Sequence, residues 1–107
     1  MTEKEKAIAK KEDIEKLTGA YVLSHPVRAA IIRLIRKQGQ MYTAKIAIAL
    51  GISERLAAFH LSMLASEGFL ESNYRLTNPG IPPRVAKYYQ LTAKVDETLR
   101  EFYESLK

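Results

Sequence analysis

Residues 43–68 read TAKIAIALGISERLAAFHLSMLASEG and predict two helices joined by a tight turn. Thr43 is placed to cap the first helix, and Gly51 supplies the conformation that a short link requires. The first helix has an apolar face, made by Ile46, Ala47 and Leu50. Ser53 is placed to cap the second helix, which ends before Gly68. The stretch therefore predicts a helix-turn-helix.

The second helix, residues 53–67, has two unlike faces when its residues are spaced at about 100°. Residues that favour burial share one face: Leu56, Ala57, His60, Leu61, Met63 and Leu64. The other face is small, polar or basic, with one aromatic residue: Glu54, Arg55, Ala58, Phe59 and Ser62. A recognition helix needs this division, because its apolar stripe anchors it while short or hydrogen-bonding side chains meet base edges. An ordinary amphipathic surface helix gives the same pattern.

After Gly68 the period of the sequence changes to that of a β-strand. Strands are expected over 69–76 and 85–91, separated by a turn segment rich in proline and glycine. Met41 and Tyr42 are candidates for a very short first strand. Helix, turn, helix and hairpin form the order of a winged helix-turn-helix. The expected fold is mainly α with a small β-hairpin wing (α+β), with added N- and C-terminal helices.

Two further segments carry a resemblance to a known family. LSHPVRAAIIRLI, residues 23–35, and ALGISERLAAFHLSMLASEGFLE, residues 49–71, resemble the ArsR-type winged-helix transcription regulators. The most specific parts are Ser-His-Pro-x-Arg and His-Leu-x-x-Leu followed by Gly-Phe-Leu, and several neighbouring winged-helix families share them. The resemblance implies a DNA-binding regulator, more often a repressor, in which the first helix often packs in a dimer interface.

The helix that begins with the Ser-His-Pro motif is expected to lie in the core. Ser24 or His25 is placed to cap it, with Pro26 in the first turn. Its apolar face is made by Val27, Ala30, Ile31, Leu34 and Ile35. Arg28 falls outside this face and is interpreted as a surface residue.

Length and composition favour one cytoplasmic domain. The chain has 107 residues, which is enough for one core, and divides into a charged extension (1–12) and a winged-helix domain (13–107). The absence of cysteine excludes disulfides and thiolate metal sites. No apolar run approaches the ~20 residues of a membrane span, and no secretory signal is recognisable. A prokaryotic, nucleoid-associated location is expected.

The net charge of +5 is concentrated in the predicted winged helix. Residues 17–91 contain nine Lys or Arg against three Glu, whereas the two ends are close to neutral. Nucleic-acid binding predicts this concentration, because neutralising phosphates supplies the non-specific part of the affinity. Solubility alone is the alternative explanation.

Predicted DNA contacts come from the first helix of the helix-turn-helix, from the outer face of the second and from the wing around 76–85. They are Thr43, Lys45, Ser53, Glu54, Arg55, Ala58, Phe59, Ser62, Arg75, Arg84 and Lys87. Arg55 can bind guanine or phosphate, and Glu54 can accept from cytosine. Phe59 can touch a thymine methyl or lie in the core. His60 is expected to be buried and hydrogen-bonded.

The terminal helices are expected to form a homodimer. Their apolar residues recur at helical spacing: Ile14, Leu17, Tyr21, Val95, Leu99, Phe102, Tyr103 and Leu106. Thr92 is placed to cap the last helix. A two-fold dimer would present its recognition helices to successive major grooves, about 34 Å apart. The alternative is a monomer whose last helix folds back on its own core.

Neither a metal nor a cofactor is expected, because the two histidines, His25 and His60, have structural explanations and there are no cysteine ligands. No phosphate loop and no nucleophile with a spaced base are present, so an enzyme is not expected. Three functions remain: a sequence-specific DNA-binding regulator, a chromatin-like non-specific DNA binder, and a protein-interaction module. An effector could be a small ligand or a partner protein, or there could be none.

Overall fold

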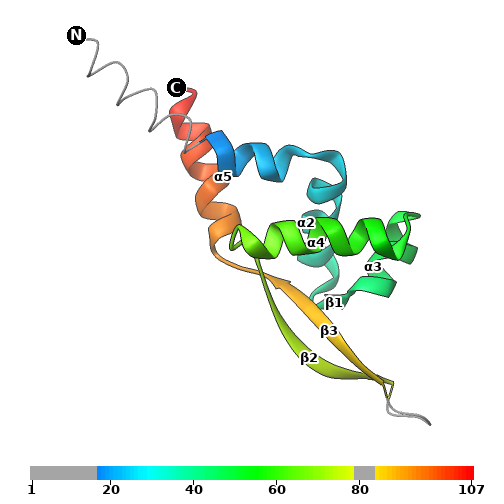
Figure 1. Cartoon of the computed structure of the whole chain (residues 1–107). Coiled ribbons are helices and arrows are strands. Elements are labelled where there is room, and N and C mark those ends of the chain that lie inside the picture. The colour runs from blue at the N-terminus through cyan, green and yellow to red at the C-terminus, as the bar shows by residue number, and fades with distance from the viewer. Residues whose placement is uncertain (1–16, 79–83) are drawn as a thin grey trace.

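The computed structural model describes residues 17–78 and 84–107 (Figure 1). The predicted extension (1–12) and Ile14 lie outside these ranges. A helical segment at 17–24 precedes the remaining elements. These are α2 (Pro26–Gln38), β1 (Met41–Tyr42), α3 (Thr43–Leu50), α4 (Glu54–Ser66), β2 (Leu70–Asn78), β3 (Arg84–Leu91) and α5 (Lys94–Ser105). This order confirms the predicted fold, mainly α with a β-hairpin and added terminal helices.

The predicted helix-turn-helix is confirmed as α3, a turn and α4. Gly51 has φ 67°, a left-handed conformation that glycine adopts without strain. Ser53 caps α4 as predicted, since its Oγ accepts from the Leu56 amide at 3.0 Å. The predicted cap at Thr43 is wrong. α3 begins at Thr43 itself, after Tyr42, because β1 runs directly into the helix.

No single helix within 17–78 or 84–107 is long and apolar enough to cross a membrane. Only α3 and α4 taken together reach the required length and composition, and the pair is bent by 114° at the turn.

The α2 helix begins as predicted and then departs from the prediction. The His25 side chain accepts from the Val27 amide at 3.2 Å, with Pro26 in the first turn. Arg28, however, is 5% exposed and buried, not on the surface. The helical segment 17–24 and α4 cover this side of α2, and a helical wheel of one element cannot show which neighbours lie against it.

The three strands form one antiparallel sheet in the order β1-β3-β2. Met41 pairs with Tyr89 and Leu70 with Leu91, so the predicted short first strand exists. Tyr89 is buried and Tyr88 is half-buried, as expected from the alternation of that strand. The hairpin of β2 and β3 extends away from the helical body, at the end opposite 17–24 and α5 (Figure 1).

One core joins the helices to the base of the hairpin. Its fully buried side chains are Ile31, Ile46, Leu61, Leu64, Phe69 and Val95. The expectation that Val95 contributes to a dimer is therefore wrong, because this residue is 1% exposed and fills its own core. The cap predicted at Thr92 is also wrong. Thr92 Oγ1 donates to the Gly68 carbonyl at 2.6 Å, and α5 begins at Lys94.

Candidate nucleic-acid interface

The outer face of α4 is the surface that the helix-turn-helix leaves open. The structure exposes the predicted set on this helix: Glu54, Arg55, Ala58, Phe59 and Ser62. Ala57, His60, Leu61 and Leu64 are buried on the opposite side, as expected. Leu56 differs from its prediction, since it is 40% exposed. It lies in the first turn of α4, at the edge of the apolar face, where the core does not reach.

His60 has the buried, hydrogen-bonded structure that was predicted. Its Nδ1 lies 3.3 Å from Arg28 Nη1, and Arg28 also donates to the Val22 carbonyl at 2.6 Å and to Met63 Sδ at 3.0 Å. Because arginine only donates, Nδ1 of His60 accepts and the ring proton is on Nε2. The pKa of His60 is lowered, first by burial and then by the charges of His25 and Arg28.

Phe59 is exposed, which excludes the alternative that it lies in the core. It is 56% exposed, with its ring edge-on to His60 at a centroid distance of 5.1 Å. Phe59 and Ser62 both border a groove that runs between α4, the segment 17–24 and the start of α2. These two residues therefore lie at one margin of the outer face, and Glu54 and Arg55 lie nearer its N-terminal end.

The two DNA contacts predicted at the start of α3, Thr43 and Lys45, differ in exposure. Lys45 is exposed, and Thr43 is half-buried beside β1.

The hairpin carries its predicted basic residues on different faces. Arg75 pairs with Ala86, and Lys87 pairs with Tyr74, so consecutive positions place Arg75 and Lys87 on opposite sides of the sheet. The Arg75 guanidinium lies 5.0 Å from the Tyr88 ring centre and donates to Gln40 Oε1 at 2.8 Å, which fixes its position. Arg84 is exposed next to the tip. Residues 79–83 of the predicted wing lie outside the described ranges.

The sequence reasoning missed an exposed apolar group on the hairpin. It did place Ile48 off the apolar face of its helix, α3. Leu76 and Val85 are paired, and Tyr74 lies on the same face two residues along β2. All three are exposed, and on α3 Ile48 is 82% exposed. The alternation of Tyr74 and Leu76 could have revealed this apolar face, because strand residues two apart share a side.

No protein-family model matches the chain, and no curated protein matches it. Solved structures do match. A possible transcriptional regulator for arsenical resistance is 20% identical, with 82% of each chain covered and a TM-score of 0.65. The AntR antimony-specific transcriptional repressor is 20% identical over 90% of this chain and 78% of its own, with a TM-score of 0.64. A GntR-superfamily winged-helix-turn-helix protein from Halomicrobium mukohataei is 18% identical over 83% and 64%, with a TM-score of 0.69.

The fold is a winged helix-turn-helix. The matching structures include an arsenical-resistance regulator, an antimony-specific repressor and a GntR-superfamily protein. The likeness therefore establishes the fold and does not select the ArsR type. At these identities, the function has to be argued from the surface of the winged helix itself.

Proposed function

We propose that this winged helix is a regulator of transcription that binds double-stranded DNA as a homodimer. The observation that carries the proposal is the outer face of α4, where Glu54, Arg55 and Ser62 are exposed around the small residue Ala58. A helix of 13 residues is about 20 Å long, which suits the major groove. The basic excess of residues 17–91 adds an electrostatic attraction to phosphates.

The side chains of α4 divide between base reading and positioning. Arg55 can donate two hydrogen bonds to guanine, and Glu54 can accept from cytosine. Ser62 can donate to phosphate, and Phe59 can contact a thymine methyl. Lys45 and Thr43 lie at the start of α3. In this proposal they contact the phosphate backbone of the DNA that α4 binds.

The hairpin would follow the DNA backbone or the minor groove beside α4. Arg75 is held against Tyr88 on one face, Lys87 lies on the opposite face, and Arg84 extends the positive charge toward the tip. Basic side chains at such positions bind phosphates and enter the minor groove. We propose repression rather than activation, and the similar AntR structure, described as a repressor, supports this choice.

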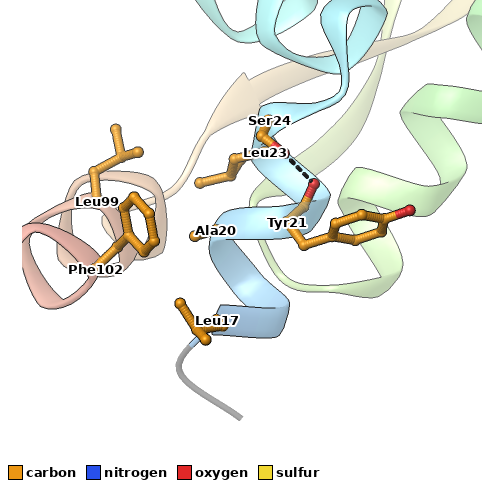
Figure 2. Close-up of a pocket in the computed structure, with 7 residues that line it drawn as sticks. All are labelled: Leu17, Ala20, Tyr21, Leu23, Ser24, Leu99 and Phe102. Atoms are coloured by element: carbon orange, nitrogen blue, oxygen red, sulfur yellow. Dashed lines mark hydrogen bonds between the residues drawn. The ribbon is translucent and has the colours of Figure 1, made fainter. Parts of the chain in front are cut away.

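Dimerisation is proposed through the segment 17–24 and α5. Leu17, Ala20 and Leu23 face Leu99 and Phe102 across an apolar pocket of about 370 Å³ (Figure 2). Leu17 and Leu99 are exposed, as are Tyr103 and Leu106 further along α5. A second copy would remove these apolar groups from water. Tyr21 also lines this pocket, and its ring points away from Leu99 and Phe102 (Figure 2).

The test is a comparison of two duplexes of equal length and base composition, one from the region upstream of the protein's own gene and one random. Affinity is measured over a series of salt concentrations. Non-specific binding depends almost entirely on electrostatic attraction to phosphates, which salt weakens, whereas specific binding depends on it only in part. We expect the upstream duplex to bind at least ~10³-fold more tightly. Equal affinities would indicate a chromatin-like role, and no binding at low salt would refute DNA binding.

A second function, protein docking, is favoured by the exposed apolar side chains near the same surface. Ile48, Leu56 and Phe59 are exposed on the helix-turn-helix, with Leu76 and Val85 exposed on the hairpin. Leu76 and Val85 share one face of the hairpin with Tyr74, and an exposed apolar group of this kind can mark an interaction site. Absence of DNA binding, together with loss of a protein partner on Ile48→Asp, would support this second function.

A further inference from the structure

Phe59 and Ser62 border a groove beside the recognition helix, which we name the α4 groove. It measures about 790 Å³ and lies between the segment 17–24, the start of α2 and α4. Its lining includes Tyr21, His25, Arg28, Phe59, Ser62 and Glu67. Small-molecule sites have volumes of ~300–1,000 Å³ and combine apolar walls with a few polar groups, and this groove fits that description.

Arg28 brings to this groove a buried positive charge without a carboxylate partner among the described residues. Its guanidinium hydrogen-bonds to a carbonyl, an imidazole nitrogen and a thioether sulfur, all of them neutral. Glu67 is the acidic residue of the lining, and within 17–78 and 84–107 no ion pair includes Arg28. A buried charge normally has an opposite charge beside it. The groove therefore has a positive floor.

Two further features agree with a positive potential at this place. Arg28 lies in the first turn of α2, which contains no acidic residue, so the positive end of the helix dipole adds to its charge. The pKa of His60 is lowered, first by burial and then by the charges of His25 and Arg28. Binding of an anion is thus favoured by more than one group.

The walls above this floor are aromatic. The His25 and His60 rings are 4.6 Å apart, and Phe59 lies edge-on to His60 at 5.1 Å. Tyr21, which points away from the proposed dimer face, is largely exposed on the other wall. Flat apolar groups bind well against such rings.

We propose that the α4 groove binds a small organic anion that joins a carboxylate to a flat aromatic group. The carboxylate is directed to Arg28 and the ring lies against Phe59 and Tyr21. Such a ligand would cover Phe59 and Ser62, and it would therefore compete with DNA for the outer face of α4. This competition rests on the proposed function, whereas binding in the groove does not.

The test uses 2-naphthoate, and 2-naphthamide as its neutral counterpart, with binding to the full chain measured by calorimetry. We expect 2-naphthoate to bind at least tenfold more tightly than the amide. Ser66→Trp fills the groove, because Ser66 is exposed on its lining, and should lower the affinity at least tenfold.

Ser105→Trp is the matched control. Ser66 and Ser105 each donate to the carbonyl three residues earlier, and Ser105 lies on α5, away from the groove. The control should keep the affinity of the native chain. Arg28→Gln should abolish the preference for 2-naphthoate over 2-naphthamide. If that variant does not fold, Ser66→Trp and the comparison of the two compounds with the native chain still test the proposal. Equal binding of acid and amide, unchanged binding in Ser66→Trp, or no binding at millimolar concentration would overturn the proposal.

The proposed competition between ligand and DNA is tested by a separate measurement. Adding 2-naphthoate should weaken DNA binding by the native chain and leave that of Ser66→Trp unchanged, as linkage between the two sites requires. If calorimetry detects the ligand and no DNA binds at low salt, the proposed function fails while the groove assignment stands. If DNA binds equally well with and without bound ligand, the competition is refuted.

Discussion

At the scale of single residues, His60 and Arg28 form a contact that only a neutral imidazole can make. Protonating Nδ1 of His60 would place an N–H against the guanidinium 3.3 Å away. The pKa of His60 is lowered in the folded chain from 6.5, so the unfolded chain binds more protons in this range.

We therefore expect the contribution of His60 to stability to be constant above pH 6.5 and to fall as the pH drops from 6.5 toward the folded pKa. The slope from this residue is at most about 1.4 kcal/mol per pH unit. Urea unfolding between pH 5 and 8 measures it, with His60→Gln as the control in which this slope is absent. Identical pH profiles for the two chains would contradict the prediction.

Ser53 has two proposed roles that different substitutions can separate. Its Oγ caps α4, so Ser53→Ala should lower the free energy of unfolding by about 1 kcal/mol. Ser53→Asp keeps a capping oxygen and should keep the stability, but its negative charge should weaken DNA binding at low salt. Thermal unfolding and fluorescence anisotropy measure the two effects. A loss of stability in Ser53→Asp as large as in Ser53→Ala would show that capping has been misjudged.

At the scale of elements, the approach of the segment 17–24 to α5 depends on Gly19. A Cβ at this position would lie 2.8 Å from Thr98 Cγ2 and 3.6 Å from Phe69 Cζ. Alanine would gain about 1 kcal/mol from helix propensity, and overpacking costs about 1–3 kcal/mol. Because Thr98 is buried and β-branched, its methyl group cannot turn away freely.

We expect Gly19→Ala to destabilise the native chain by up to about 2 kcal/mol, and to stabilise a Thr98→Ser chain, which lacks the obstructing methyl group. Urea unfolding of the four chains gives the coupling between the two positions. An equal effect of Gly19→Ala in both backgrounds would mean that the two elements do not lie this close.

Local sequence signals were sufficient for most elements and failed where another element decides the outcome. The turn at Gly51 and the caps at Ser53 and His25 depend on neighbouring residues only, and these predictions are confirmed. Arg28 was misplaced because the C-terminal turn of segment 17–24 supplies a carbonyl to it. Val95 was misplaced because a periodic stripe does not reveal which of its members the core already covers.

The candidate site was predictable in part, for the same reason. The residues predicted on the outer face of α4 follow from helical periodicity and are exposed, whereas Leu56 is exposed against its prediction. The different faces of Arg75 and Lys87 follow only from strand register, which the sequence did not fix. The α4 groove is formed by three separate elements, so no single stretch of sequence could indicate it.

At the scale of the whole molecule, the proposed dimer makes a prediction about oligomeric state. Leu99 is 45% exposed on the apolar surface between α5 and 17–24, so Leu99→Asp should place a charge in the interface and yield monomers. Ile48→Asp is the control. Ile48 is also an exposed apolar residue, but it lies on α3, outside the interface proposed between 17–24 and α5. Sedimentation velocity should show a dimer for the native chain and the control. A native monomer, or a dimer that survives Leu99→Asp, would refute this interface.

The central claim, that the outer face of α4 binds DNA, is tested most directly by anisotropy of a labelled duplex against salt for three chains. The chains are the native protein, Arg55→Ala and Arg100→Ala, the last removing an exposed arginine on α5. We predict that Arg55→Ala weakens binding by about 1–3 kcal/mol, and that Arg100→Ala binds like the native chain. If both substitutions have the same effect, or if neither has any, α4 does not bind DNA through Arg55 and the account is wrong.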